Sequence, residues 1–455
     1  MRLWGDRSAG PRLASVDKWI AREAIPFSFD RNFDAAVDRM MQGLGDQVSL
    51  LGIGEALHGG EEFFVLRNRL FQRLVEAHGF SAITLETNDP RARLVDAYIS
   101  GRGPADYEAI EDDGFSYGAG RYAANRELVE WMKRYNSDPA HSVKLNFYGT
   151  LPSPQGTPLE SPRQALELAL SYLKSVDAAA AAARYGAIIE PLLGPDADWE
   201  DAAAAIEKEM MARLLGGDSA DSLRPGSAAP DPTKEVGLSP EAQTLRLAVE
   251  NFAFELQMRR PELVAKSNRE SFNAAQHDLF VARNLLALHA ALARRESLDT
   301  LVSMRDAMAA EYLVYIADRE QARGKVLVHL HNAHLRRTRT KLPWYEFWPT
   351  GAHLEQLFGQ RFALIGGALG TSEANFIGAP EPGSLEARLL ALKANCFIPA
   401  RRGKPLAGGV PPVRTGSTNP MVPYTPLSSE SVADFDVIAF LRSTGYTRGA
   451  APLSG

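Results

Sequence analysis

Short runs of apolar and β-branched residues, each bounded by turn-forming residues, are the most regular pattern along the chain. Runs of this length and composition are typical of buried β-strands. They occur at residues 48–53, 82–85, 143–148, 325–330, 362–365 and 435–440. Because the runs lie toward both ends of the sequence, we expect one sheet that takes strands from the N-terminal and the C-terminal parts of the chain.

A helical pattern separates the first two runs. Apolar residues recur at helical spacing from Glu62 to His78, and Gly79 follows as a helix stop signal. A strand, a helix and a strand in this order normally form a crossover between parallel strands of one sheet. The pattern predicts an α/β fold with a central, mostly parallel sheet flanked by helices, in which the first two strands are neighbours.

The middle of the chain has helical periodicity and high helix propensity. Ser161 offers an N-cap, Pro162 stands at the first helical position and Gln164 can complete a capping box. Further helices are expected at residues 177–184, 199–215, 239–259 and 271–294. We therefore expect a large helical insertion that lies over a cleft of the α/β core.

These patterns divide the chain into three parts. Residues 1–150 and 301–455 are expected to form the α/β core, and residues 151–300 the insertion. Residues 216–233 are rich in Gly, Ser, Ala, Asp and Pro, which predicts a mobile loop. Gly and Pro are also frequent at residues 401–428, where we expect a long irregular connection before the last strand.

The composition restricts the class of protein. Apolar residues make up 45% and charged residues 23% of the chain, the balance of a soluble globular protein. The net charge of -6 argues against nucleic-acid binding, which normally needs an excess of basic residues. Cys396 is the single cysteine, which excludes a disulfide within the chain. Without a signal peptide or an apolar run of about 20 residues, we expect a cytoplasmic protein with no membrane or nucleic-acid partner. The oligomeric state is left open.

The first candidate site residues follow the first predicted strand, in the glycine-rich stretch 54–60. This stretch places Glu55 and His58 at the carboxyl end of a strand, where open α/β sheets bind ligands. The flanking glycines allow a tight turn and the close approach of a substrate. An isolated histidine at such a position is more often structural, but the nearby carboxylate makes His58 a candidate general base.

The next strand ends at Glu86, which is expected at the same edge of the sheet as Glu55 and His58. A carboxylate there could accept a hydrogen bond from an imidazole, fix its tautomer and raise its basicity. A helix cap or a surface ion pair is the alternative for Glu86. Arg67 falls on the helix after His58 and could reach an anionic group in the pocket, although most arginines are solvated.

The third cluster lies at the end of the predicted strand 325–330 and contains three of the nine histidines of the chain. His329 and His331 point to the same face by strand alternation, and His334 lies on the turn beyond the strand. The imidazole of His331 and the amide of Asn332 could donate hydrogen bonds to a developing oxyanion. We expect Asn332 and His334 to bind substrate.

Metal binding is the competing interpretation of these residues. The pairs Glu55 with His58 and His331 with His334 supply enough donors for zinc or a related ion. Neither pair has a strong zinc signature, and the chain contains no HExxH, GxSxG or Walker motif. We predict no metal and no cofactor, and keep a metal-dependent hydrolase of an ester or amide as the alternative.

The order and spacing of these motifs resemble the erythromycin esterase family. The resemblance extends over residues 54–59, 62–67, 78–86, 304–309 and 331–334. It implies a hydrolase that opens a macrolide's lactone ester by water attack and thereby inactivates macrolide antibiotics, without a metal.

The resemblance also implies roles for individual residues. His58 corresponds to the general base, and Glu55 and Glu86 to its acidic neighbours. Arg67 and His331 correspond to further groups of the active site. A small ester or macrolide-like molecule is the expected partner. A protein that binds a large lactone beneath the helical insertion without cleaving it is a third interpretation.

Overall fold

The central sheet of the computed structural model has the strand order β1-β9-β10-β8-β2-β5-β3-β4. The structure describes residues 9–151, 159–214, 235–342, 345–400, 413–418, 422 and 424–451. The strands are β1 (Ile25–Phe27), β2 (Leu50–Glu55), β3 (Phe80–Asn88), β4 (Asn146–Leu151), β5 (Lys325–His331), β8 (Phe362–Thr371), β9 (Asn395–Pro399) and β10 (Val437–Ser443). All pairings are parallel except those of β9 with β1 and with β10. The predicted mostly parallel α/β sheet is confirmed.

One predicted neighbour relation is wrong. β2 and β3 are not adjacent, because β5 lies between them and pairs in parallel with both. A strand–helix–strand connection places both strands in one sheet, but it does not require them to be adjacent, so a third strand can lie between them. β5 is apolar and almost wholly buried along its length, as expected for a central parallel strand. Its insertion brings the second histidine cluster between the two ends that carry Glu55 and Glu86.

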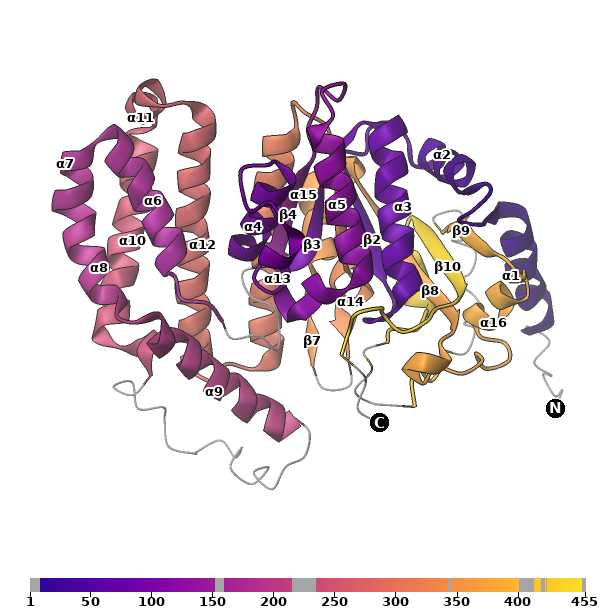
Figure 1. The fold of residues 1–455 in the computed structure, drawn as a ribbon. Helices are drawn as coiled ribbons and strands as arrows, with labels where there is room; N and C mark the ends of the chain where they lie inside the picture. Colours follow the sequence, from indigo (N-terminus) through magenta and orange to yellow (C-terminus); the bar gives the residue numbers. More distant parts are fainter. Residues whose placement is uncertain are drawn as a thin grey trace.

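Helices cover both faces of the sheet (Figure 1). One layer consists of α2 (Phe33–Leu44), α3 (Glu61–His78), α4 (Asp89–Ile99) and α5 (Ala123–Ser137). The other consists of α1 (Ala9–Glu23), α13 (Leu298–Glu320), α15 (Thr350–Phe358) and α16 (Leu385–Leu390). Strand residues alternate between the two layers: Leu51 and Ile53 pack in the first core, and Leu50 packs in the second. The α3 helix ends as predicted, since Gly79 adopts the left-handed conformation with φ 71°.

The predicted helical insertion is also confirmed. It consists of α6 (Arg163–Val176), α7 (Ala178–Ala180), α8 (Ala187–Leu193), α9 (Asp196–Leu214), α10 (Pro240–Met258), α11 (Arg260–Lys266) and α12 (Arg269–Ala293). These helices have a hydrophobic core of their own and stand beside the sheet and its flanking helices in Figure 1. The alanine-rich helix continues as a π-helical turn at Ala181–Gly186. The predicted mobile loop 216–233 lies outside the described residues, as does most of 401–428.

Shorter elements complete the described chain. They are β6 (Thr340–Lys341) and β7 (Glu346–Phe347), which pair antiparallel, the helices α14 (Asn332–Leu335) and α17 (Ser429–Asp434), and the 3-10 turns η1 (Tyr107–Ala109), η2 (Ser116–Arg121), η5 (Val236–Leu238), η6 (Gly359–Arg361) and η7 (Glu373–Asn375). Of the helices that the structure describes, none combines the length and the apolar character needed to cross a bilayer.

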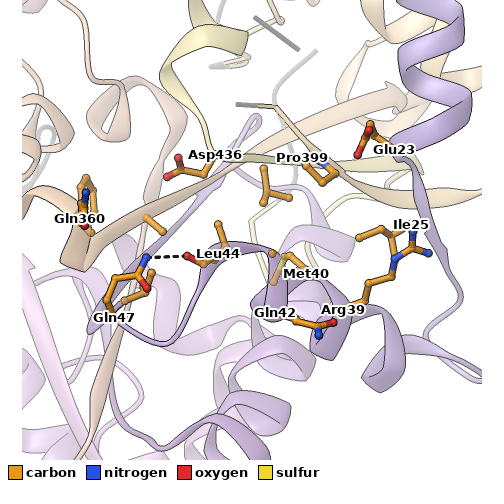
Figure 2. Close-up of a pocket in the computed structure, with 15 residues that line it drawn as sticks. Glu23, Ile25, Arg39, Met40, Gln42, Leu44, Gln47, Gln360, Pro399 and Asp436 are labelled. Atoms are coloured by element: carbon orange, nitrogen blue, oxygen red, sulfur yellow. Dashed lines mark hydrogen bonds between the residues drawn. The ribbon is translucent and has the colours of Figure 1, made fainter. Parts of the chain in front are cut away.

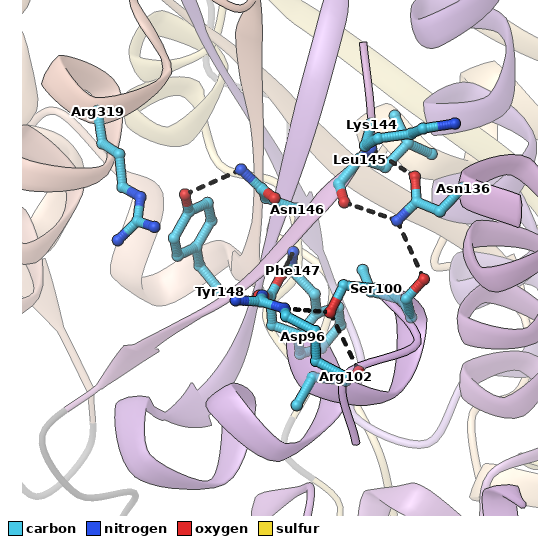
Figure 3. A network of polar contacts seen from close by, with 12 residues as sticks. Asp96, Ser100, Arg102, Asn136, Lys144, Leu145, Asn146, Phe147, Tyr148 and Arg319 are labelled. Carbon is cyan, nitrogen blue, oxygen red and sulfur yellow. Dashed lines mark hydrogen bonds and ion pairs between the residues drawn. The ribbon is translucent and has the colours of Figure 1, made fainter. Parts of the chain in front are cut away.

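The edge strand β4 is fixed by polar side chains rather than by a further strand (Figure 3). The amide of Asn136 accepts a hydrogen bond from the backbone of Leu145 at 2.6 Å and donates one to its carbonyl at 2.9 Å. Asp96 accepts one from the backbone of Phe147 at 3.0 Å. These contacts satisfy backbone groups of Leu145, just before β4, and of Phe147 within it, which this edge of the sheet would otherwise expose.

Candidate active site

Glu55 and His58 form a hydrogen-bonded pair at the carboxyl end of β2. The distance between Glu55 Oε1 and His58 Nδ1 is 2.5 Å. Glu55 is buried, whereas the side chain of His58 is 42% exposed. Since Nδ1 is engaged by the carboxylate, Nε2 is the ring nitrogen that remains for a molecule in the solvent.

The loop that carries His58 is held by segments from the C-terminal part of the chain. The backbone of Thr425 donates to the Ala56 carbonyl at 2.8 Å, and that of Thr447 donates to the Gly59 carbonyl at 3.0 Å. Gly59 has φ 82°, a conformation that favours glycine, which agrees with the tight turn expected from the sequence. The loop is therefore positioned by tertiary hydrogen bonds in addition to its own turn.

Two opposing effects act on the pKa of His58. Partial desolvation of the ring by the surrounding protein disfavours the imidazolium, but the hydrogen bond and the charge of Glu55, together with the charge of Glu86, outweigh it. The pKa of His58 is therefore raised above its usual value of 6.5. A more basic imidazole is a stronger proton acceptor when it is neutral.

His331 ends β5 directly opposite Glu55 and faces His58, with the two ring centroids 4.4 Å apart. Its Nδ1 accepts a hydrogen bond from the backbone of Ala333 at 3.3 Å, so the proton of a neutral ring sits on Nε2. Burial and the positive charges of His58 and His334 hold the pKa of His331 well below its usual value. Among the described residues, no partner of normal hydrogen-bond geometry reaches Nε2, although the backbone of Ala56 acts on the ring and opposes the lowering of its pKa. His331 is thus a neutral donor.

Glu86 lies at the end of β3, on the other side of His331. Its Oε2 accepts a hydrogen bond from the backbone N–H of His331 at 3.2 Å, and its Oε1 accepts one from Arg305 of α13 at 3.1 Å. Burial would raise the pKa of Glu86, but the charges of His334, His58 and Arg305 lower it to about 2. Glu86 is therefore a carboxylate at neutral pH, placed among the histidines.

His334 forms a second histidine–carboxylate pair with Asp306 of α13. Its Nδ1 lies 2.9 Å and 3.0 Å from the two carboxylate oxygens. Asp306 is fully buried and also accepts hydrogen bonds from the backbone and the hydroxyl of Thr350. Asp306, itself held by Thr350, therefore fixes the orientation of the His334 ring.

Arg67 lies beneath the site, inside the protein. Its guanidinium donates to the amide oxygens of Asn68 and Asn125 and packs over the ring of Phe64. Burial lowers the pKa of Arg67 to about 10, while the charge of Glu55 opposes this shift. The side chain remains a cation that offsets the buried charge of Glu55.

Asn332 does not join the other predicted site residues. Its amide oxygen accepts from the backbone N–H of Gly367 and its amide nitrogen donates to the carbonyl of the same residue, at 3.0 Å and 2.8 Å. Both groups of the amide are thus used inside the sheet, where a Cβ at Gly54 would collide with the amide oxygen. The substrate-binding role of Asn332 stays a prediction, and these bonds indicate instead that its side chain turns into the sheet.

Three groups of the site carried no assigned role in the sequence analysis. Arg305 and Asp306 contact Glu86 and His334, and their motif entered only through the family resemblance. On a helix, an adjacent Arg and Asp look like an ordinary solvated pair. Glu207 of α9 is the third: burial raises its pKa to about 7, and the charge of Arg305 acts on it. An acidic side chain of the helical insertion is thus within electrostatic reach of Arg305.

Histidines and carboxylates meet at this edge, but they are engaged in pairs. His329 Nε2 lies 3.7 Å from Glu55 Oε2, and burial and the charge of Arg67 hold the pKa of His329 well below its usual value. In the part of the chain that the structure describes, no three His, Cys, Asp or Glu side chains are arranged to hold a metal ion.

A cavity of about 480 Å³ lies at the opposite, amino edge of the sheet (Figure 2). It is lined by the end of α2 and by the first residues of β8 and β10, with Arg39, Gln47 and Asp436 among its polar groups. None of the predicted site residues lines it. The paired histidines and carboxylates lie at the carboxyl edge instead, which makes that edge the candidate active site.

The fold and the site together define an α/β protein with two histidine–carboxylate pairs at the carboxyl edge of its sheet. A sequence model described as erythromycin esterase matches residues 75–444, which is most of the chain. The chain belongs to the erythromycin esterase family.

Individual relatives are distant. The erythromycin esterase type II of Escherichia coli is 26% identical over 139 residues, which cover 29% of this chain and 30% of that protein. A Bacillus cereus protein of solved structure is similar in fold, with a TM-score of 0.72, 18% identity and coverage of 96% of this chain and 99% of that chain.

Two further solved structures share the fold. A succinoglycan biosynthesis protein has a TM-score of 0.65 at 16% identity and covers 97% of this chain and 100% of its own. An erythromycin esterase mutant in its open conformation has a TM-score of 0.60 at 16% identity, with coverage of 92% and 97%. At these identities the similarity concerns the fold alone.

Proposed function

We propose that the protein hydrolyses a carboxylic ester, with a macrolide lactone as the leading substrate class, by attack of a water molecule that His58 activates. The observation that carries the proposal is the Glu55–His58 pair. A partly exposed imidazole is bound at Nδ1 by a buried carboxylate, which leaves Nε2 to accept a proton. Macrolides are favoured as substrates because the chain belongs to the erythromycin esterase family.

The first step of the proposed reaction is proton transfer. His58 Nε2 removes a proton from water while the water oxygen attacks the ester carbonyl carbon. Glu55 holds the ring in position and stabilises the imidazolium that forms, as a carboxylate does in other histidine-based hydrolases. The raised pKa of His58 favours this transfer once the ring is neutral.

The second requirement is stabilisation of the negative charge on the carbonyl oxygen. Neutral His331 carries its proton on Nε2 and stands 4.4 Å from the His58 ring, centroid to centroid. A preorganised N–H donor at a developing oxyanion is worth roughly 10²–10³ in rate. Arg67 contributes through its charge beneath Glu55, because its guanidinium is already bound by Asn68 and Asn125.

Incubation with a panel of macrolides and simple esters, followed by mass spectrometry, tests the reaction class and the substrate together. Hydrolysis of a lactone adds the mass of one water to the intact molecule. Simple esters instead release an acid and an alcohol. Recovery of every compound unchanged, with one macrolide bound to the protein, would replace the hydrolase by a sequestering protein.

The metal-dependent alternative is separated by two further measurements on the same sample. Elemental analysis of the purified protein and activity before and after chelation report whether a metal-bound water is the nucleophile. The proposal requires that activity survive chelation. Loss of activity on chelation, restored by one added metal, would favour the alternative.

A further inference from the structure

We propose that His334, positioned by Asp306, is the acid that protonates the departing alcohol, so that the two histidine–carboxylate pairs of the site have opposite tasks. This inference rests on the proposed ester hydrolysis and supplies the group that its second step needs. Asp306 acts through His334 and is a positioning residue.

The geometry of the pair suits this task. His334 Nδ1–H donates to both oxygens of Asp306, at 2.9 Å and 3.0 Å, so Nε2 points away from the carboxylate. Thr350 fixes Asp306 in turn, with its backbone N–H at 2.8 Å and its hydroxyl at 3.0 Å from Oδ1. A ring clamped at Nδ1 can exchange a proton at Nε2 without reorienting.

His334 also has the right position relative to the proposed base. The charge of His334 acts on Glu86 and His331, and the charge of His58 acts on the same two residues. His58 comes from the loop between β2 and α3, whereas Asp306 comes from α13 on the other face of the sheet. His58 thus follows a strand toward the layer of α3, whereas the carboxylate that holds His334 belongs to a helix of the other layer.

Ester hydrolysis needs groups on different sides of the reacting carbon, because the entering water and the leaving alcohol occupy different corners of the tetrahedral intermediate. In the first step the water oxygen bonds to the carbon and its proton passes to His58. In the second step the bond between carbon and alkoxide oxygen breaks, and His334 gives its proton to that oxygen. The products are one acid and one alcohol, and solvent returns the proton from His58 to His334.

The test compares two esters that share an acyl group and differ in the leaving alcohol, ethyl acetate and p-nitrophenyl acetate. An alkoxide needs a proton to leave, whereas a nitrophenolate does not. Asp306→Asn and His334→Gln should each lower kcat/KM for the ethyl ester by about 100-fold and for the nitrophenyl ester by less than about 5-fold. The double variant should lose no more than the stronger single variant, since the two residues act as one unit.

Asp434→Asn is the matched control. Asp434 is as buried as Asp306 and accepts a 2.7 Å hydrogen bond from Arg336, but it contacts none of the site histidines. Its variant should change the rates for both esters by the same factor. If Asp306→Asn fails to fold, His334→Gln still decides the question, because His334 is partly exposed.

Two outcomes would overturn the inference. One leaves the proposed ester hydrolysis standing, and the other removes it too. Equal losses on both esters in the His334 and Asp306 variants would leave ester hydrolysis intact and remove His334 as the acid. Wild-type protein that hydrolyses neither ester nor any macrolide of the panel would remove the proposed function as well.

Discussion

The 2.5 Å contact between Glu55 Oε1 and His58 Nδ1 has a measurable consequence for the pH dependence of ester hydrolysis. His58 must be neutral to accept a proton, so kcat/KM should fall as the pH drops through its pKa, which Glu55 raises above 6.5. Sequence reasoning found both residues, because a strand end followed by glycines is readable locally. The sequence could not show which ring nitrogen of His58 contacts Glu55, or how exposed the His58 ring is.

Glu55→Gln tests this contact. The amide removes the negative charge that raises the pKa of His58, so the acid limb of the kcat/KM profile should move to lower pH while its plateau falls. The measurement is log kcat/KM against pH for wild type and variant on the same ester. An acid limb that stays in place would show that Glu55 does not control the titrating group.

At the scale of secondary-structure elements, the order and register of the strands position these residues. The sequence predicts the strands themselves better than it predicts their order. The runs of β2, β3 and β5 were predicted, but local periodicity does not encode the order of strands, so the insertion of β5 between the other two was missed. The orientation of Asn332 depends on the same arrangement. Its amide bridges the end of β5 to β8 only because β2 lies between them and bears a glycine, Gly54, at the crossing point.

Asn332→Ala tests that interpretation of the amide. The substitution leaves the buried N–H and carbonyl of Gly367 without their partner, which should lower the free energy of unfolding by about 2 kcal/mol. KM should change little, because the amide is bonded to Gly367 inside the sheet. Denaturant unfolding and steady-state kinetics on one preparation check both statements. A large rise in KM with unchanged stability would support the substrate-binding role instead.

At the scale of the whole molecule, the helical insertion and the α/β core meet through a partly buried ion cluster. Arg93 of α4 contacts Asp278 of α12 at 2.5 Å and Asp89 at 2.7 Å, and both carboxylates are nearly buried. Figure 1 shows α12 as the insertion helix that faces the core. The sequence predicted a helical insertion from periodicity, but the contacts that join it to the core pair residues 185 positions apart, which no local pattern reveals.

Arg93→Met should destabilise the molecule by about 2 kcal/mol, less than for a fully buried pair because Arg93 is 37% exposed. Arg102→Met is the control. Arg102, which is 71% exposed and follows α4, pairs with Asp96 of that helix, and its loss should cost less than about 1 kcal/mol.

The loss of stability caused by Arg93→Met should also depend on pH. Without the arginine, two buried carboxylates face each other and take up protons more readily, so the deficit should be larger at pH 7 than at pH 4. Calorimetric unfolding at both pH values measures this difference. Equal effects of Arg93→Met and Arg102→Met would contradict the assigned role of the cluster.

The central claim is that His58 activates water for ester hydrolysis, and the most direct test is the rate of His58→Ala beside that of His78→Ala. His78 is the matched control, since it also pairs with a carboxylate, Asp38 at 2.8 Å, but lies at the far end of α3. On any ester or macrolide that gains water with the wild type, His58→Ala should reduce kcat by at least about 100-fold with an unchanged melting temperature, and His78→Ala by less than about 3-fold. Near-normal hydrolysis by folded His58→Ala would contradict the account.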